Sequence, residues 1–229
     1  MCETPSWPPL VVMLRLQTCS VPGQAKTQLL LTLAALARSP EVGQALWQGL
    51  EQAQVLQTTH VMPGQQARGI KMELEEVEAR AEQFAQTRAF LRLLSVLVDA
   101  GVPAGLGAGL RAPGIHPHLG FVIHDVLLNY NSRAYKDPAE KYEVAADCLE
   151  ILLKLVNTYD PTAGELGLSV NGDLTSGQPG AAVVLQLMQR SKLLKLVLSI
   201  LDEACRQLGE YRDVAGRASH GALPPRPAP

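Results

Sequence analysis

The sequence predicts an all-α protein, built as an irregular α-solenoid segment of stacked antiparallel helix hairpins. Apolar residues recur every three to four positions along most of the chain, which is the period of an α-helix. Alternating strand patterns of Val, Ile and Thr are scarce, and the Val-Val pairs lie beside helix formers such as Leu, Ala and Met. Short turns join consecutive helices, but no strict repeat of roughly 34 or 40 residues is present, so any repeat is irregular.

Two helices are predicted near the start, after a lead-in of residues 1–20. The first spans about residues 25–38. The second begins at Ser39-Pro40-Glu41, where Ser39 is a good cap and Pro40 suits the first helical position. Because this junction is so short, the two helices must fold back on each other. Residues 63–69, rich in Pro and Gly, separate them from the next element.

A long third element is predicted over residues 70–100, ended by Gly101 and Pro103. Its first half is charged and carries a narrow apolar stripe made of Ile70, Leu74, Val77, Ala81 and Phe84. After Thr87 the pattern becomes apolar on most sides, so we expect other helices to cover the second half all round. The change of pattern predicts a bend or break near residues 84–87.

Residues 117–131 predict a fourth helix, and a fifth begins at Asp137. Asp137 can accept a hydrogen bond from a free amide of the first turn, Pro138 tolerates the first position, and Glu140 can reach back to the cap. Asp160-Pro161 ends this helix. Its predicted core-facing stripe, with Leu149 at the centre, consists of Tyr142, Ala146, Leu149, Leu153 and Val156.

Two further helices are predicted after a Gly-rich excursion over residues 160–179. They span about residues 180–190 and 191–211, and the apolar stripe of the last one consists of Leu193, Val197, Leu201, Ala204 and Leu208. From Gly216 on, Pro, Gly, Ala and Arg leave little to bury, which is typical of a disordered tail. The predicted organisation is therefore a lead-in (1–20), an α-solenoid segment (21–212) and a disordered tail (213–229).

Composition favours a soluble, reduced protein that does not bind nucleic acid. Of the 229 residues, 47% are hydrophobic, which is enough for a core, and the net charge of -2 gives no field that attracts phosphate backbones. Four cysteines without a Cys-x-x-Cys pair suggest free thiols in the nucleus or cytosol. The start does not resemble a signal peptide, and the apolar runs are far shorter than the roughly 20 residues of a transmembrane helix.

The best candidate for a ligand site is the loop of residues 105–118 together with His124. His116 and His118 lie two residues apart, but no acidic or thiol ligand completes a tetrahedron, so surface histidines are the favoured interpretation. Gly105-Leu106-Gly107-Ala108-Gly109 resembles a phosphate-binding loop but follows no strand. A helical ligand- or metal-binding domain that uses this loop is the alternative function.

Three other groupings are better explained as structure. Gly23-Gln24-Ala25-Lys26-Thr27 ends like a P-loop but has Ala before Lys and follows no strand. The carboxylates of residues 73–82 predict a solvated helix face, with Lys71 and Arg80 as pairing partners. Tyr130, Arg133, Tyr135, Lys136 and Lys141 form a basic, aromatic group of the kind that binds RNA. Acidic neighbours cancel the positive field of this group. No catalytic residue and no cofactor is expected, so the chain is not predicted to be an enzyme.

Several strings, in this order, resemble one protein family. The strings are Leu33-Ala34-Ala35-Leu36, Ser39-Pro40-Glu41, Leu46-Trp47-Gln48, Leu56-Gln57-Thr58, Glu73-Leu74-Glu75-Glu76-Val77-Glu78-Ala79-Arg80, Thr87-Arg88-Ala89-Phe90, Leu106-Gly107-Ala108-Gly109-Leu110-Arg111, Arg133-Ala134-Tyr135-Lys136 and Ala139-Glu140-Lys141-Tyr142-Glu143-Val144-Ala145. Over roughly residues 10–212 their combination is similar to the giant inner-ring scaffold nucleoporins of the nuclear pore complex, and closest to the larger of the two paralogues.

The resemblance implies a piece of a superhelical α-solenoid that builds the inner ring at the nuclear envelope. It also implies binding to short linear segments of linker nucleoporins and contacts with other inner-ring scaffold proteins. Family members are several times longer, so the resemblance implies an internal fragment or a short gene product. No binding residue carries over, because no partner-contact motif matches positions of this chain.

Self-association through the ends of the segment is a further expectation. Each repeat of a solenoid buries its apolar surface only by stacking on the next one. The stripes of the first helix (Leu29, Leu33, Leu36) and the last helix (Leu193, Val197, Leu201) are therefore expected to bind a second copy or amphipathic partner segments.

Overall fold

The computed structural model describes residues 8–58, 68–107, 114–160, 178–188 and 191–220. Most of these residues are helical, as predicted, and β-type pairing among them is limited to one isolated bridge between Leu56 and Gly69. No helix in this part of the chain combines the length and apolar character needed to cross a membrane. The chain divides into two compact units, residues 1–185 and residues 186–229.

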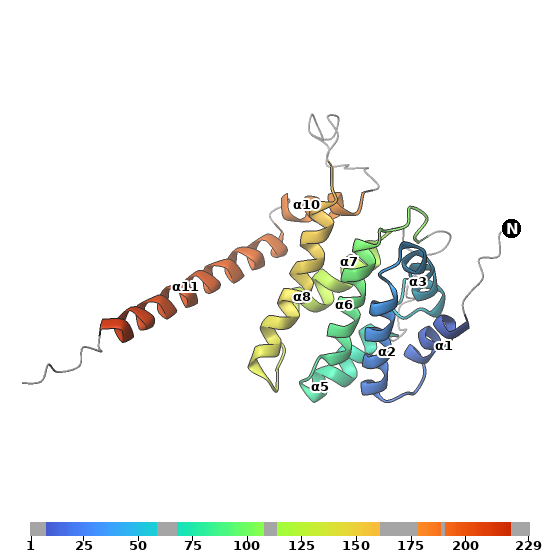
Figure 1. Ribbon diagram of the computed structural model, residues 1–229, viewed down its shortest axis with the longest axis horizontal. Helices are drawn as coiled ribbons and strands as arrows, with labels where there is room; N and C mark the ends of the chain where they lie inside the picture. The colour runs from blue at the N-terminus through green and yellow to red at the C-terminus, as the bar shows by residue number, and fades with distance from the viewer. Residues whose placement is uncertain (1–7, 59–67, 108–113, 161–177, 189–190, 221–229) are drawn as a thin grey trace, which may run out of the picture. The chain divides into compact units, whose positions relative to one another are not determined.

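The helices of the first unit lie side by side (Figure 1). Its regular α-helices are α1 (Pro8–Gln17), α2 (Gly23–Leu36), α3 (Pro40–Ala53), α4 (Ile70–Met72), α5 (Ala79–Ala81), α6 (Ala85–Asp99), α7 (His116–Gly120) and α8 (Pro138–Asn157). Two π-helical turns and one 3-10 turn interrupt them: η1 (Glu73–Glu78), η2 (Phe121–Val126) and η3 (Leu127–Asn129). α7, η2 and η3 together occupy the place of the predicted fourth helix.

Helix α6 is the centre of the first unit. It lies between α2 on one side and α8 on the other (Figure 1). Phe90, Leu93 and Leu97 are fully buried, and side chains on nearly every side of α6 are covered. The prediction that this apolar stretch must be surrounded by other helices is confirmed.

The predicted break between the two halves of residues 70–99 is also confirmed. α5 ends at Ala81, Glu82 takes the left-handed conformation with φ 56°, and α6 begins at Ala85. The buried Glu78 carboxylate then caps α6, because it accepts hydrogen bonds from the backbone N–H of Gln86 at 2.6 Å and of Thr87 at 3.1 Å. Burial raises the pKa of Glu78, although the hydrogen bonds from Thr87 and Gln86 oppose the shift.

The π-helical turn η1 changes which side chains meet the core. Val77 and Ala81, expected in the apolar stripe, are exposed, whereas Glu73 and Glu78 are buried. A π-helix has more residues per turn than an α-helix, so the spacing of the inward positions shifts. The prediction of a solvated face is therefore wrong for these two glutamates, and Glu73 pairs with the buried Lys26 at 2.5 Å.

Of the two cations predicted to pair with the carboxylates of residues 73–82, one does so and the other does not. Arg80 pairs with Glu76 on the same helical stretch, as expected. Lys71 instead pairs with Asp125 of η2 at 2.7 Å. The ion pair of Lys71 therefore links two segments that are far apart in the sequence.

The N-terminal helices agree with the prediction in position but not in exposure. α2 and α3 match the two predicted helices, and Ser39 occupies the cap position of α3, although its side chain makes no cap hydrogen bond. Part of the predicted lead-in forms the additional helix α1, which packs on α2 and α3. Leu33 is fully buried, so the expectation that the α2 stripe forms an open apolar end is wrong.

The last two helices are α10 (Pro179–Met188) and α11 (Lys192–His220). α11 continues past the predicted end at Tyr211, since Ala215, Arg217 and Ala218 favour helix, and it therefore includes residues 213–220. Of the other predictions, the Gly-rich excursion over residues 161–177 and the tail over residues 221–229 lie outside the described residues.

Candidate functional site

Helix α8 is fixed at its first turn by two hydrogen bonds. Asp137 Oδ1 accepts from the Ala139 N–H at 2.9 Å, which confirms the predicted cap, and Pro138 takes the first helical position. Glu140 does not reach back to the cap as predicted, because its Oε1 accepts from the Phe84 N–H at 3.0 Å. This bond ties the start of α8 to the break that precedes α6.

The inner face of α8 packs on α6 and belongs to the core. Its buried residues are Val144, Ala145, Cys148, Ile151, Leu152 and Leu155. Burial raises the pKa of the Cys148 thiol, so this cysteine is a core residue and not a nucleophile. Near the other end of α8, a Cβ added at Gly180 would lie 2.2 Å from the Leu155 carbonyl oxygen, so α10 begins in close contact with α8.

The predicted core stripe of α8 is wrong, because these residues form the outer face of the helix. Tyr142 and Leu153 are 51% and 60% exposed, Ala146 is exposed, and Leu149 is only partly buried. α8 is apolar on two sides, and periodicity alone does not tell which side meets α6. We call Tyr142, Ala146, Leu149, Leu153 and Val156 the outer stripe.

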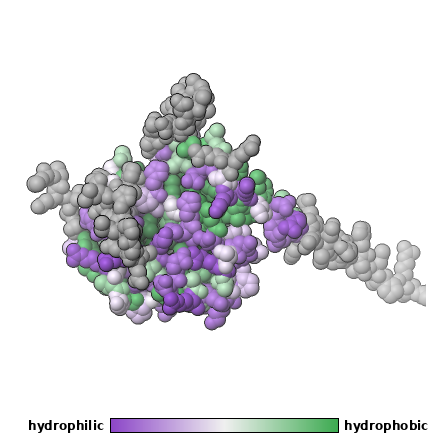
Figure 2. Space-filling model, turned by 180° about the vertical axis from the view of Figure 1, so that it is seen from behind, coloured by the Kyte–Doolittle hydropathy of each residue, from purple (hydrophilic) through white to green (hydrophobic). Residues whose placement is uncertain are grey.

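The outer stripe exposes two large apolar side chains, Tyr142 and Leu153, on one helix. Figure 2 shows apolar residues gathered toward one side of a face whose middle is mostly hydrophilic. Large apolar patches on soluble proteins mark sites of interaction. The outer stripe is therefore the best candidate for a functional site among the described residues.

A row of carboxylates runs along one edge of the outer stripe. This acidic row consists of Glu143, Asp147 and Glu150, each one position further along α8 than a residue of the stripe. Arg88 of α6 donates from Nε to Asp147 at 3.0 Å and also pairs with Glu143. Burial raises the pKa of Asp147, against the effect of the hydrogen bond from Arg88.

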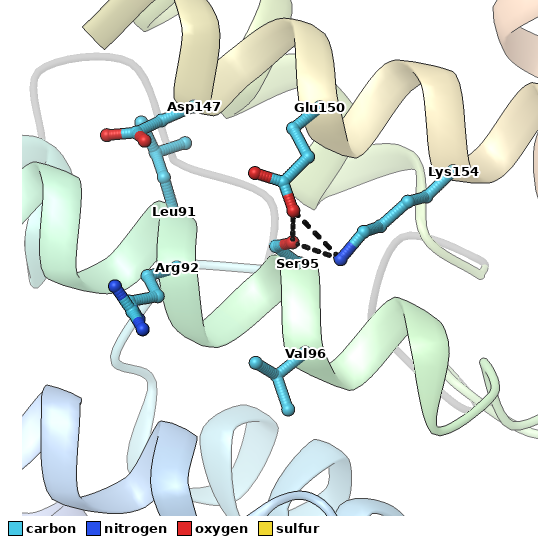
Figure 3. Close-up of a pocket in the computed structure, with 7 residues that line it drawn as sticks. All are labelled: Leu91, Arg92, Ser95, Val96, Asp147, Glu150 and Lys154. Atoms are coloured by element: carbon cyan, nitrogen blue, oxygen red, sulfur yellow. Dashed lines mark hydrogen bonds and ion pairs between the residues drawn. The ribbon is translucent and has the colours of Figure 1, made fainter. Parts of the chain in front are cut away.

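A groove of about 250 Å³ between α6 and α8 lies beside the acidic row (Figure 3). Its lining consists of Leu91, Arg92, Ser95, Val96, Asp147, Glu150 and Lys154. Lys154 Nζ lies 2.9 Å from Glu150 Oε1 and donates to Ser95 Oγ at 2.7 Å. Hydrogen bonds from Lys154 and Ser95 lower the pKa of Glu150. Arg92 is exposed and forms no ion pair with any residue that the structure describes.

The three candidate histidines do not form a common site. His116 and His124 are exposed, as predicted for surface histidines, but His118 is buried against Trp47, with ring centroids 5.1 Å apart. The surface prediction is therefore wrong for His118, because α7 turns this residue into the core. Among the described residues no group of three His, Cys, Asp or Glu side chains is placed to hold a metal ion.

The glycine loops are not arranged to bind phosphate in the part of the chain that is described. Gly105 and Gly107 follow helix α6 and not a strand, and the Gly107 N–H donates to Glu51 Oε1 at 2.8 Å. Ala108 and Gly109 lie outside the described residues. Lys26, the lysine of the P-loop-like string, is buried and paired with Glu73.

Members of the basic, aromatic group near Arg133 make contacts within the first unit. Arg133 is largely buried and pairs with Glu75 at 2.6 Å. Tyr130 is buried, and the ammonium group of Lys141 lies over its ring. These contacts and the Asp137 cap agree with the interpretation of this group as a capped and salt-bridged helix start.

Comparison with known proteins gives a consistent result over nearly the whole chain. Residues 1–222 match the family described as "Nup192: Nuclear pore complex scaffold, nucleoporins 186/192/205". The chain is 42% identical over 222 residues to the human nuclear pore complex protein Nup205, and 37% identical over 216 residues to Nup205 of Drosophila melanogaster. A more distant relative is NUP205 of Arabidopsis thaliana, 29% identical over 147 residues and 62% of this chain.

The chain is much shorter than these relatives. The human alignment covers 95% of this chain but 11% of Nup205, and the Drosophila alignment covers 94% of this chain and 10% of its relative. The chain thus spans about a tenth of the length of the curated relatives that it matches.

Proposed function

Because the chain belongs to the Nup192 family of nuclear pore complex scaffold proteins, we propose that it is a structural segment of the inner ring of the pore. The family is one of scaffold proteins, and the chain is not an enzyme. In this role residues 21–212 would act as one α-solenoid segment at the nuclear envelope, supporting nucleocytoplasmic transport by holding other nucleoporins in place.

The observation that supports this proposal is the outer stripe of α8. It is an apolar surface on a helix that is capped at Asp137 and packed on α6 along its other face. A scaffold binds its partners through such fixed surfaces, since little ordering is required when the partner arrives. The partners in this proposal are linker nucleoporins and other inner-ring scaffold nucleoporins, with no role for nucleic acid.

Affinity capture from nuclear envelope extract tests the proposal. The full chain is immobilised, and the retained nucleoporins are identified by mass spectrometry for wild type, Leu153→Asp and Val12→Asp. Val12 is a matched control, because it is an apolar residue 55% exposed on α1, away from α8. We expect linker or inner-ring nucleoporins on wild type and Val12→Asp and a loss with Leu153→Asp. Failure of wild type to retain any nucleoporin, or equal retention by Leu153→Asp, would refute the proposal.

A further inference from the structure

The outer stripe has the spacing of a helix–helix seam. Its residues follow one another at steps of four, three, four and three positions. This repeat averages 3.5 residues, which keeps an apolar seam facing a second helix that lies nearly parallel to the first. A partner helix can therefore contact the stripe along its whole length, from Tyr142 to Val156.

The acidic row gives one edge of this seam a charge. Glu143 and Glu150 have side chains 52% and 55% exposed, whereas their cationic partners Arg88 and Lys154 are only 34% and 25% exposed. The carboxylates thus lie further out than the cations that pair with them. A helix placed on the outer stripe would meet negative charge first along this edge.

We propose that the outer stripe binds an amphipathic helix of a partner chain whose aliphatic heptad seam is flanked by Lys or Arg residues facing the acidic row. The inference rests on the proposed function and adds the chemistry of the partner. Pairing of an apolar seam with complementary flanking charges is how helices select partner and orientation in coiled coils.

The groove beside the acidic row supports a partner helix with positively charged flanking residues. A lysine or arginine of the partner is long enough to lie along the apolar surface and place its charge between Asp147 and Glu150. Asp147 is half-buried, with Arg88 as its ion-pair partner among the described residues, so an added cation compensates a partly desolvated carboxylate. Arg92 of the groove is exposed to solvent, so leaving it without an ion pair costs little.

Two synthetic helical peptides test the proposal on the full chain. Both carry the same leucine heptad seam, one with lysines and the other with glutamates along the flanking edge, and fluorescence anisotropy measures the Kd of each. We expect the lysine peptide to bind about tenfold more tightly, the range that a few surface ion pairs supply. Raising the salt concentration should reduce this preference, because exposed charges are screened.

Variants of the chain assign the effect to the named residues. The triple variant Glu143→Gln, Asp147→Asn, Glu150→Gln should bind both peptides with similar Kd, and Leu153→Asp should weaken binding of both. Glu76→Gln, an exposed carboxylate on η1, is the matched control and should keep the wild-type preference. Circular dichroism melting curves verify that each variant is folded. The comparison of the lysine peptide with the glutamate peptide on the wild-type chain tests the role of charge without any substitution in the chain.

Several results would overturn the proposal. Equal Kd values of the two peptides for wild type would show that the edge charge is not recognised, and tighter binding of the glutamate peptide would show that Arg92 and Lys154 set the preference. A wild-type dimer in sedimentation that Leu153→Asp dissociates would show that a second copy covers the stripe. If the capture experiment retains nucleoporins while the peptides bind equally, only this inference fails; if no nucleoporin is retained, the proposed function fails instead.

Discussion

His118 is a neutral histidine in the core of the first unit. Its ring packs edge-to-face on Trp47, whose Nε1–H donates to the Gly101 carbonyl at 3.1 Å. Burial lowers the pKa of His118 to about 4, and its Nδ1 finds no hydrogen-bond partner within the described structure. Protonation therefore puts a charge into an apolar site, which the folded chain resists.

This arrangement predicts a pH dependence of stability. The pKa of His118 is lower in the folded state than the ordinary value of about 6.5, so the unfolded state binds more protons as the pH falls. The free energy of unfolding should decrease from pH 7 toward pH 4, with a contribution from His118 on the order of 3 kcal/mol. His118→Leu should remove this contribution, as measured by urea unfolding at a series of pH values.

His124→Leu is the matched control, because His124 is exposed on η2. It should keep the wild-type pH dependence. If His118→Leu and His124→Leu show the same difference in stability between pH 7 and pH 4, His118 is not buried as a neutral residue.

Glu78 predicts a second effect at the scale of single residues. Its carboxylate caps α6 through Gln86 and Thr87, so Glu78→Ala leaves these backbone donors unpaired in a buried place. We expect a loss of about 1–3 kcal/mol in the free energy of unfolding. Glu76→Ala, at an exposed position two residues away, should cost less than about 0.5 kcal/mol. Comparable losses in the two variants would contradict the cap.

The sequence did not reveal these buried polar residues, for a physical reason. Charged side chains and histidines are mostly exposed, so an exposed position is the default interpretation. The partner that makes burial of Glu73 tolerable is Lys26, 47 residues earlier in the chain. Local periodicity carries no information about such a distant partner.

At the scale of elements, α8 shows what an apolar pattern can and cannot predict. The cap at Asp137 and the extent of the helix follow from residues near in sequence, and both were predicted. The choice between two apolar faces depends on which one α6 covers, and the prediction selected the outer face. The carboxylates of Glu143, Asp147 and Glu150 could not decide between the two faces, because they lie between them and pair with Arg88 of α6 and Lys154 of α8.

The two faces of α8 predict opposite results for the same substitution. Ile151 is 2% exposed, so Ile151→Asp loses about 1.5–3 kcal/mol of apolar burial and adds a buried charge, which should unfold the chain. Leu153→Asp lies on the outer stripe and should leave the melting temperature within a few degrees of wild type. Circular dichroism melting measures both. If Leu153→Asp lowers the melting temperature by more than a few degrees, Leu153 is buried in the folded chain and the outer stripe belongs to the core.

The backbone conformation at Gly69 requires glycine, so the stability of the chain should depend strongly on this residue. Its φ is +65°, and an added Cβ would lie 2.2 Å from the Val55 carbonyl oxygen. Gly69→Ala should therefore destabilise the chain by more than about 1 kcal/mol. Gly105→Ala is the control, because open space surrounds that position. Urea unfolding that gives the same loss for both variants would contradict the close approach of residues 55 and 69.

At the scale of the whole molecule, fold class was predicted well because it depends on period and composition over many residues. The all-α class and the break before α6 are properties of pattern, and both are confirmed. The helix α1 was missed, since it begins with two prolines, Pro8 and Pro9, in a segment treated as a lead-in. The exposed face of α8 could not be predicted from the sequence, because it is what remains after the other described helices of the first unit have packed.

The most direct test of the central claim is recruitment of the chain to nuclear pores in living cells. A fluorescently tagged full chain is compared with the double variant Leu149→Asp, Leu153→Asp, both shown beforehand to be folded by circular dichroism. We predict a nuclear-rim signal for the wild-type chain and a diffuse signal for the variant, because we propose that the outer stripe makes the contact with other nucleoporins. A wild-type chain that stays diffuse, or a variant that marks the rim equally well, would contradict the account.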